Sequence, residues 1–221
     1  MDWEALTLSL KLAAITLLVL LPMGLLLGRW LAYTNVSYKA WIEGLVVLPL
    51  VLPPTVLGYY LLVSMGGGSP VGQWLNDTFG IRLTFNFLGL VIASVIFNIP
   101  FLVQPIQRAF ESIPRELGEA AAVSGLSKWQ SFWRIELLLA WPGILSGMVL
   151  TFVHTLGEFG VVLMVGGSIP GETKTIAISI YDRVQSFDLD GANQMAITLL
   201  ILSLAAVVAS FFASARLAIR R

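Results

Sequence analysis

Residues 111–142, ESIPRELGEAAAVSGLSKWQSFWRIELLLAWP, place charged side chains between two apolar parts of the chain. Residues 83–107, just before this segment, contain no Asp, Glu, Lys or Arg. Pro114 suits the first turn of a helix, where a missing N–H leaves no hydrogen bond unmade, and Gly125 suits the position just past a helix end. Ser127 and Gln130 have the spacing of a capping box. The segment is therefore predicted to form two short helices joined by a tight turn.

The second of these helices is predicted to have one apolar face. Leu126, Trp129, Trp133 and Leu137 recur at helical spacing on it. A helical hairpin of this kind is too polar to cross a bilayer, and its apolar face suits docking on another surface. The alternative is an amphipathic helix that lies in the membrane interface without a protein partner.

The spacing within this hairpin resembles a known motif. Glu119-Ala120-Ala121, followed by Gly125 and Ile135, is similar to the EAA loop of the permease subunits of bacterial binding-protein-dependent ABC importers. The family pattern has Leu-Pro after the Ile, whereas the nearest proline here is Pro142. The resemblance implies a type I ABC importer fold, in which the second helix docks in a cleft on a separate ATPase subunit. The implied docking residues are Glu119, Ala120, Ala121, Gly125, Leu126, Trp129, Trp133 and Ile135.

Composition identifies an integral membrane protein. The chain is 57% hydrophobic and 12% charged, with a mean hydropathy of +0.86, whereas soluble proteins are about 25% charged. Zero net charge and the lack of a basic tail argue against a nucleic-acid partner. Without cysteine the chain has no disulfide and no thiolate site, and its sequence shows no paired carboxylates, metal-ligand cluster or activated nucleophile. We therefore expect no enzymatic activity and no bound metal.

The apolar runs predict an all-α polytopic bundle of about five transmembrane helices in a single domain, residues 1–221. About 20 apolar residues are needed to cross the bilayer. The first run has no small-residue cleavage site and is expected to be a retained span. Gly24 and Gly28 in it have GxxxG spacing, which lets another helix approach closely. The predicted spans are 6–28, 43–65, 84–108, 141–165 and 192–215, with a cytoplasmic docking loop at 109–140 and a flexible Gly-rich loop at 66–82.

Prolines interrupt the second predicted span. Pro49, Pro53 and Pro54 remove backbone donors, and Gly58 follows, so this helix must be broken or bent. Freed carbonyls at membrane depth need protein or a water-filled cavity beside them. From the prolines alone, a helix that lines the pathway and a kinked helix packed inside the bundle are equally consistent. Residues 49–60 resemble the second span of molybdate permeases, which favours the pathway.

The fourth predicted span contains His154 and Glu158, one helical turn apart. Three roles compete: a proton relay, a buried interhelical hydrogen bond, or a gate. At about 1.5 Å per residue Glu158 lies about 25 Å along the span, nearer the outer face than the middle. Residues 154–160 resemble a Leu-Gly-Glu-Phe-Gly segment of molybdate and sulfate permeases, although a carboxylate would repel an oxyanion. The predicted pathway or gate residues are Pro53, Pro54, Gly58, His154, Glu158 and Gly160.

A Gly-rich segment, residues 166–175, fails the test for a nucleotide site. A phosphate-binding loop has Lys directly after its second glycine, and Glu172 occupies that place. The chain is therefore expected to bind no cofactor, and any ATP and Mg²⁺ would be used by the partner ATPase. The segment resembles an external loop of molybdate permeases, in which Lys174 and Arg183 either assist entry of a dianion or are simply solvated.

The distribution of cations predicts the orientation. With the docking loop inside, the inner segments hold nine Lys or Arg and the outer segments four, so the positive-inside rule places the N-terminus outside. The C-terminus and the docking loop are then cytoplasmic, in a bacterial cytoplasmic (inner) membrane. The inner cations are Arg29, Lys39, Arg108, Arg115, Lys128, Arg134, Arg216, Arg220 and Arg221, and the outer ones are Lys11, Arg82, Lys174 and Arg183.

The function expected from these features is import of molybdate by the membrane subunit of an ATP-driven transporter. Five spans are too few to enclose a gated path, and Ala205, Ala209 and Ala213 form a small-residue stripe that suits close helix packing. A second copy of the chain, two ATPase subunits and an external molybdate-binding protein are the expected partners. The alternatives are tungstate or sulfate as substrate, an ATP-independent secondary anion transporter, and a scaffold that transports nothing.

Overall fold

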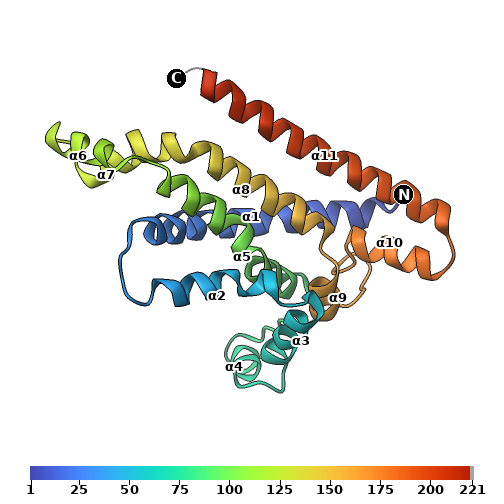
Figure 1. Ribbon diagram of the computed structural model, residues 1–221. Helices are drawn as coiled ribbons and strands as arrows, with labels where there is room; N and C mark the ends of the chain where they lie inside the picture. The colour runs from blue at the N-terminus through green and yellow to red at the C-terminus, as the bar shows by residue number, and fades with distance from the viewer. Residues whose placement is uncertain (220–221) are drawn as a thin grey trace.

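The computed structural model describes residues 1–219, and its side chains as far as Ala213 (Figure 1). Within this range every regular element is a helix. Arg216, Arg220 and Arg221, which the orientation prediction uses, lie outside the described side chains. The elements are α1 Trp3–Tyr33, α2 Lys39–Val51, α3 Pro54–Met65, α4 Pro70–Phe79, α5 Phe87–Glu111, α6 Arg115–Val123, α7 Lys128–Ser131, the π-helix η1 Phe132–Glu136, α8 Leu137–Gly157, α9 Gly160–Gly166, α10 Ile176–Gln185 and α11 Leu189–Ile219.

The expectation of about five apolar spans is confirmed. Among the described residues, four helical stretches are long and apolar enough to cross a membrane: Trp3–Tyr33, Phe87–Glu111, Lys128–Gly157 and Leu189–Ala213. The pair α2 and α3 makes a fifth if it is counted as one broken span, and its two halves are bent by 107°. The predicted break at the prolines of the second span is therefore present.

Helix α5 lies at the centre of the bundle. It packs against α1, α8, α2 and α9, and Leu102, Ile106 and Phe110 on it are fully buried. These three side chains form a core cluster with Leu20 of α1 and Ile144 of α8. In Figure 1 the helices α6 and α7 lie at one end of the bundle, and α10 and the N-terminus lie at the other.

Gly24 and Gly28 bring α1 against α5, as their spacing predicts. Both glycines are buried. A Cβ on Gly24 would lie 2.8 Å from Leu102 Cδ2, and one on Gly28 would lie 2.7 Å from Ile106 Cγ2 and 3.2 Å from the backbone N of Gln107. The two helices therefore approach at a distance that leaves no room for a larger residue at either position.

The prediction of a flexible loop at 66–82 is wrong, because this segment contains α4. The Ser69 side chain accepts a hydrogen bond from the Gly72 N–H at 2.8 Å, and Pro70 occupies the first turn. Gly80 ends the helix in the left-handed conformation, at φ 67°. Each of these is a regular helix boundary signal, so the local chemistry outweighs the high glycine content of the segment.

The predicted limits of the fourth span are also wrong. Helix α8 ends at Gly157, Glu158 is extended with ψ 127°, and the short helix α9 follows. At the other end α7, η1 and α8 form one uninterrupted helical stretch, Lys128–Gly157. Pro142 lies inside it. The second helix of the docking loop is thus the beginning of the fourth span.

The outer-loop cations considered for anion entry are both paired. Lys174 forms an ion pair with Asp182 at 2.8 Å, and Arg183 forms one with Asp188. Because the Gly191 N–H and the Arg183 guanidinium both stabilise its charge, the pKa of the Asp188 carboxyl is lowered from its usual value. These pairs fix α10, a helix that the sequence did not predict, to its neighbours.

Replacing Gly28 with Val is predicted to destabilise the bundle by about 1–3 kcal/mol, the usual cost of overpacking. Thermal unfolding of the detergent-purified protein measures this. Gly44→Val is the matched control, since Gly44 is also helical and a Cβ there meets nothing within 4 Å. An equal loss of stability in both variants would contradict the close α1–α5 contact.

Candidate functional site

The first docking helix, α6, ends in a tight turn at Gly125. Gly125 has φ 77°, a left-handed conformation that favours glycine. The Gly125 N–H donates to the Ala122 carbonyl and the Leu126 N–H donates to the Ala121 carbonyl, both at 3.0 Å. This pair of bonds is a Schellman motif. It reverses the chain within two residues and confirms the predicted role of Gly125 as the helix-ending residue.

The second docking helix begins with the predicted capping box. The Ser127 hydroxyl accepts from the Gln130 N–H at 3.2 Å, and the Gln130 side chain accepts from the Ser127 N–H at 2.9 Å. After one turn of α7 the helix passes into η1, in which the Leu137 N–H donates to the Phe132 carbonyl, five residues back. A single π turn of this kind inside a longer helix is uncommon and frequently occurs at functional sites.

The predicted docking residues divide between an exposed and a covered set. Trp129 and Trp133 are 68% and 50% exposed, and their rings meet edge to face with centroids 5.5 Å apart. Glu119, Ala120 and Gly125 are exposed as well, whereas Ala121 is buried and Leu126 and Ile135 are half-buried. The two tryptophans and the exposed side of α6 are therefore the accessible part of the predicted docking surface.

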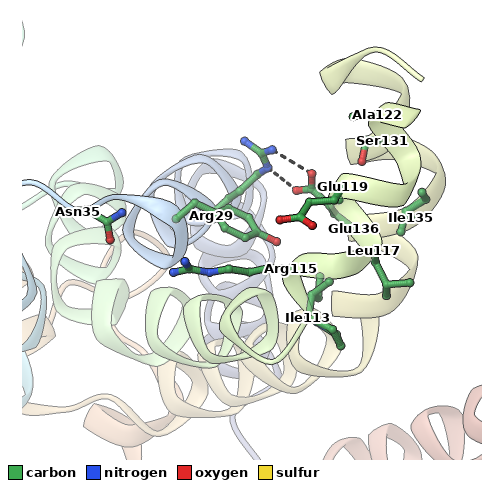
Figure 2. Close-up of a pocket in the computed structure, with 13 residues that line it drawn as sticks. Arg29, Asn35, Ile113, Arg115, Leu117, Glu119, Ala122, Ser131, Ile135 and Glu136 are labelled. Atoms are coloured by element: carbon green, nitrogen blue, oxygen red, sulfur yellow. Dashed lines mark hydrogen bonds and ion pairs between the residues drawn. The ribbon is translucent and has the colours of Figure 1, made fainter. Parts of the chain in front are cut away.

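A cavity of about 440 Å³ lies between α6, η1 and the end of α1. Figure 2 shows the Arg29–Glu136 ion pair at this cavity, whose lining also includes Glu119 and Arg115 of α6. Two arginines and two carboxylates thus line one opening. The lining residues are Arg29, Tyr33, Asn35, Ile113, Pro114, Arg115, Leu117, Gly118, Glu119, Ala122, Ser131, Ile135 and Glu136.

The structure brings two helix breaks together, the predicted one in the second span and an unpredicted one in the fourth. Gly58 of α3 lies against α9, where a Cβ would be 2.8 Å from Met164 Cβ and 3.1 Å from Val161 Cα. A Cβ on Gly160 would lie 2.9 Å from Pro54 Cβ. The Pro53–Pro54 break of the second span and the break after Gly157 in the fourth are therefore in contact.

His154 and Glu158 are linked differently from the prediction. They do not share a helical face, because Glu158 lies beyond the end of α8. Instead Asn98 of α5 joins them: its Oδ1 lies 3.0 Å from His154 Nδ1, and its Nδ2 donates to Glu158 Oε2 at 3.4 Å. The Ser94 hydroxyl donates to the same oxygen at 3.2 Å. Of the three roles considered, the geometry matches the interhelical hydrogen bond.

The environment of this network is closed. Glu158 is 4% exposed, and its Oε1 has no hydrogen-bond partner among the described residues. The His154 ring stacks on Phe101, with centroids 3.8 Å apart. Sequence reasoning missed Ser94 and Asn98 as partners of Glu158, and it missed Arg29 with Glu136. The partners in these contacts are far apart in the sequence, so no local sequence pattern identifies them.

The chain matches one family model and a set of related permeases. Residues 21–221 match the binding-protein-dependent transport system inner membrane component. The chain is 46% identical over 196 residues to the molybdenum transport system permease protein ModB of Azotobacter vinelandii, covering 88% of this chain and 86% of that protein. The Escherichia coli K12 protein of the same name is 39% identical over 217 residues, with 98% and 93% covered. The sulfate transport system permease protein CysT of that strain is 33% identical over 181 residues, with 82% and 65% covered.

Two solved transporters share the fold. A permease chain of a bacterial ABC transporter for the acidic polysaccharide alginate superposes with a TM-score of 0.79 at 22% identity, covering 96% of this chain and 78% of that one. A chain of the MetNI methionine ABC transporter gives a TM-score of 0.71 at 17% identity, with 98% and 94% covered. At this level of sequence identity, the similarity to the two structures shows the fold alone. From the family match and the relatives together, the chain belongs to the binding-protein-dependent transport system inner membrane components, the multi-pass permease subunits of ABC importers.

Proposed function

We propose that this permease subunit translocates molybdate across the bacterial cytoplasmic membrane. The observation that carries the proposal is the identity of 39–46% to two molybdenum permeases over 88–98% of the chain. The relative named for sulfate transport is more distant, at 33%. Tungstate and sulfate are the runner-up substrates, since both are tetrahedral dianions like molybdate.

The docking loop supports a separate ATPase as the source of energy. Its helix-ending Gly125 and its capping box hold a turn that projects from one end of the bundle (Figure 1). Trp129 and Trp133 expose large apolar rings there, as expected of residues that anchor a protein interface. Two ATPase subunits, one for each docking loop of a dimer, would bind and hydrolyse ATP with Mg²⁺, and this chain would bind neither.

A second copy of the chain and an external binding protein complete the proposed assembly. The small-residue stripe of α11, at Ala205, Ala209 and Ala213, is exposed in the single chain, which supports close packing against another helix. The solved alginate transporter includes a periplasmic protein carrying its substrate. By analogy, a periplasmic molybdate-binding protein would deliver the anion to the end of the bundle that holds α10.

The proposed orientation places the N-terminus outside and the docking loop in the cytoplasm. The position of α6 and α7 at the end of the bundle opposite the N-terminus is consistent with it (Figure 1), and so is the excess of Lys and Arg on the docking-loop side. ATP-driven closure of the ATPase subunits would draw two docking loops together and open the spans outward, and release would reset them.

Molybdate uptake by a strain lacking its own permease is predicted to be restored by this chain together with its ATPase and binding protein. Mass detection of intracellular molybdenum measures uptake, with excess sulfate as the competitor. Depletion of ATP should abolish the uptake. Uptake that continues without ATP would indicate a secondary transporter, and complete suppression by sulfate would indicate sulfate as the substrate.

Glu119→Lys is predicted to abolish uptake while the protein stays in the membrane at its normal amount. The substitution reverses a charge on the docking side of α6, beside the cavity. Glu116→Lys is the matched control: it makes the same change on the same exposed helix, at a residue that does not line the cavity. Uptake of at least half the normal rate is expected for the control. Equal rates in both variants would contradict the assigned docking side.

Glu158→Ala is predicted to reduce both thermal stability and uptake, whereas Glu158→Gln keeps most of each. Alanine leaves the Ser94 hydroxyl and the Asn98 amide without their acceptor, and a buried unpaired donor costs about 1–3 kcal/mol. The glutamine amide oxygen still accepts both bonds. Thermal unfolding and uptake are measured on the same preparations. If Gln proves as damaging as Ala, Glu158 acts through its ionisable carboxyl and the hydrogen-bond explanation fails.

A further inference from the structure

Arg29 near the end of α1 is joined to Glu136, the last residue of η1. The Arg29 Nε–H donates to Glu136 Oε2 at 2.7 Å and its Nη2 donates to Oε1 at 3.1 Å. Figure 2 shows the two parallel bonds. A two-pronged Arg–carboxylate pair fixes direction as well as distance, which a lysine cannot do. The Glu136 side chain is 14% exposed and the Arg29 side chain 36%, so the pair is partly buried at the edge of the cavity.

Aromatic rings hold the guanidinium on both sides of this pair. Its carbon lies 5.4 Å from the ring centroid of Tyr33, on α1, and 5.3 Å from that of Phe132, on η1. Both rings also lie next to Phe110 of α5, with centroids 6.3 Å and 6.5 Å away. The ion pair therefore lies against the packed core at this end of the bundle, at the edge of the cavity.

The π turn sets the direction in which Glu136 points. An α-helix places one residue about every 100° around its axis, and a π turn inserts one extra residue. The residues before the π turn are therefore rotated about the helix axis relative to the residues after it. Here the π turn follows Trp129 of α7, includes Trp133 and precedes α8. Glu136 closes it and contacts α1.

Helix α1 packs against α5 and α8 in the core of the bundle, and the Arg29–Glu136 pair adds a contact to it from η1. The cavity of about 440 Å³ separates α6 from this end of α1. Movement of α6 and α7 passes directly into α8, because α7, η1 and α8 are one helical stretch. The only ion pair between η1 and α1 among the described residues is Arg29–Glu136.

We propose that Arg29 and Glu136 are positioning residues that couple the docking loop to α1, so that an ATPase moves α1 and α8 together. The inference rests on the proposed function, because it needs an ATPase bound to the docking loop. It assigns to the pair a role in converting ATP hydrolysis into transport, beyond a contribution to folding.

The test compares transport with hydrolysis in the assembled importer. Arg29→Ala and Glu136→Gln are purified with the ATPase, reconstituted in liposomes and supplied with loaded binding protein. Both ATP hydrolysis and molybdate taken up are measured, together with the melting temperature and the amount of ATPase retained. We expect the ATPase to remain bound and active, and the anions moved per ATP to fall at least fivefold.

Lys39→Ala is the matched control. Lys39 forms longer contacts, 3.7 Å to Glu43 within α2 and 3.8 Å to Glu111 at the end of α5, and neither contact involves α6, α7 or η1. Its transport per ATP should stay within twofold of the unmodified chain. Arg29→Lys, which keeps the charge and loses the two-pronged contact, should fall like Arg29→Ala, and it serves as the second variant if alanine prevents assembly.

The exchange Arg29→Glu with Glu136→Arg supplies a rescue. Restoration of transport per ATP to at least half of normal in this double variant would support the coupling role. An unchanged ratio in Arg29→Ala and Arg29→Lys, or an equal fall in Lys39→Ala, would overturn it. If the unmodified assembly moves no molybdate at all, the proposed substrate fails instead, and the coupling is tested with sulfate or tungstate in the same liposomes.

Discussion

The need to satisfy every backbone polar group within lipid governs this structure. A helix break at membrane depth frees N–H and C=O groups that lipid cannot bond, so it is tolerated only where protein covers it. The described part of the chain has two such breaks, at Pro53 and at Glu158, and they pack against each other through Gly160 and Pro54. Each break covers part of the other. The junction is anchored to α5 by the hydrogen bonds from Ser94 and Asn98 to Glu158.

Glycine makes the close packing around α5 possible. Gly24 and Gly28 admit α5 against α1, and Gly147 admits Leu102 of α5 against α8. Without a strong hydrophobic driving force between helices in lipid, such close backbone approach supplies much of the attraction through dispersion. The central helix can therefore contact α1, α2, α8 and α9 at once. It also carries the polar side chains that hold the junction, so packing and the candidate gate depend on the same element.

Features encoded within a few residues of each other were predictable from the sequence. The Gly125 turn, the Ser127 capping box, the proline break and the apolar spans each depend on local spacing, and the structure contains all of them. The end of α8 at Gly157 was not predicted, because the apolar run continues beyond it and glycine within an apolar span also occurs where helices pack closely. Hydropathy alone detects a run of apolar residues and does not show whether the helix is broken within that run.

Contacts between residues that are distant in the sequence could not be predicted, for a different reason. Arg29 and Glu136 are separated by 107 positions, and Asn98 and Glu158 by 60. Each residue has an ordinary local explanation, as an interfacial cation or a helix-surface acid, so nothing in its own neighbourhood identifies its partner. The small helices α4 and α10 fall between these cases. The capping residues Ser69 and Gly80 of α4 are visible in the sequence, but short amphipathic segments look much like loops.

The uninterrupted helix from Lys128 to Gly157 has a mechanical consequence. Its 30 residues make a rod of about 45 Å, which exceeds the hydrocarbon thickness of about 30 Å by about three turns. One end therefore stands clear of the lipid as a lever arm while the other ends at the break beside Glu158. A tilt of about 5° displaces one end by about 4 Å relative to the other at this length. A small displacement of the protruding end of this helix is thus transmitted along it to the break at Glu158.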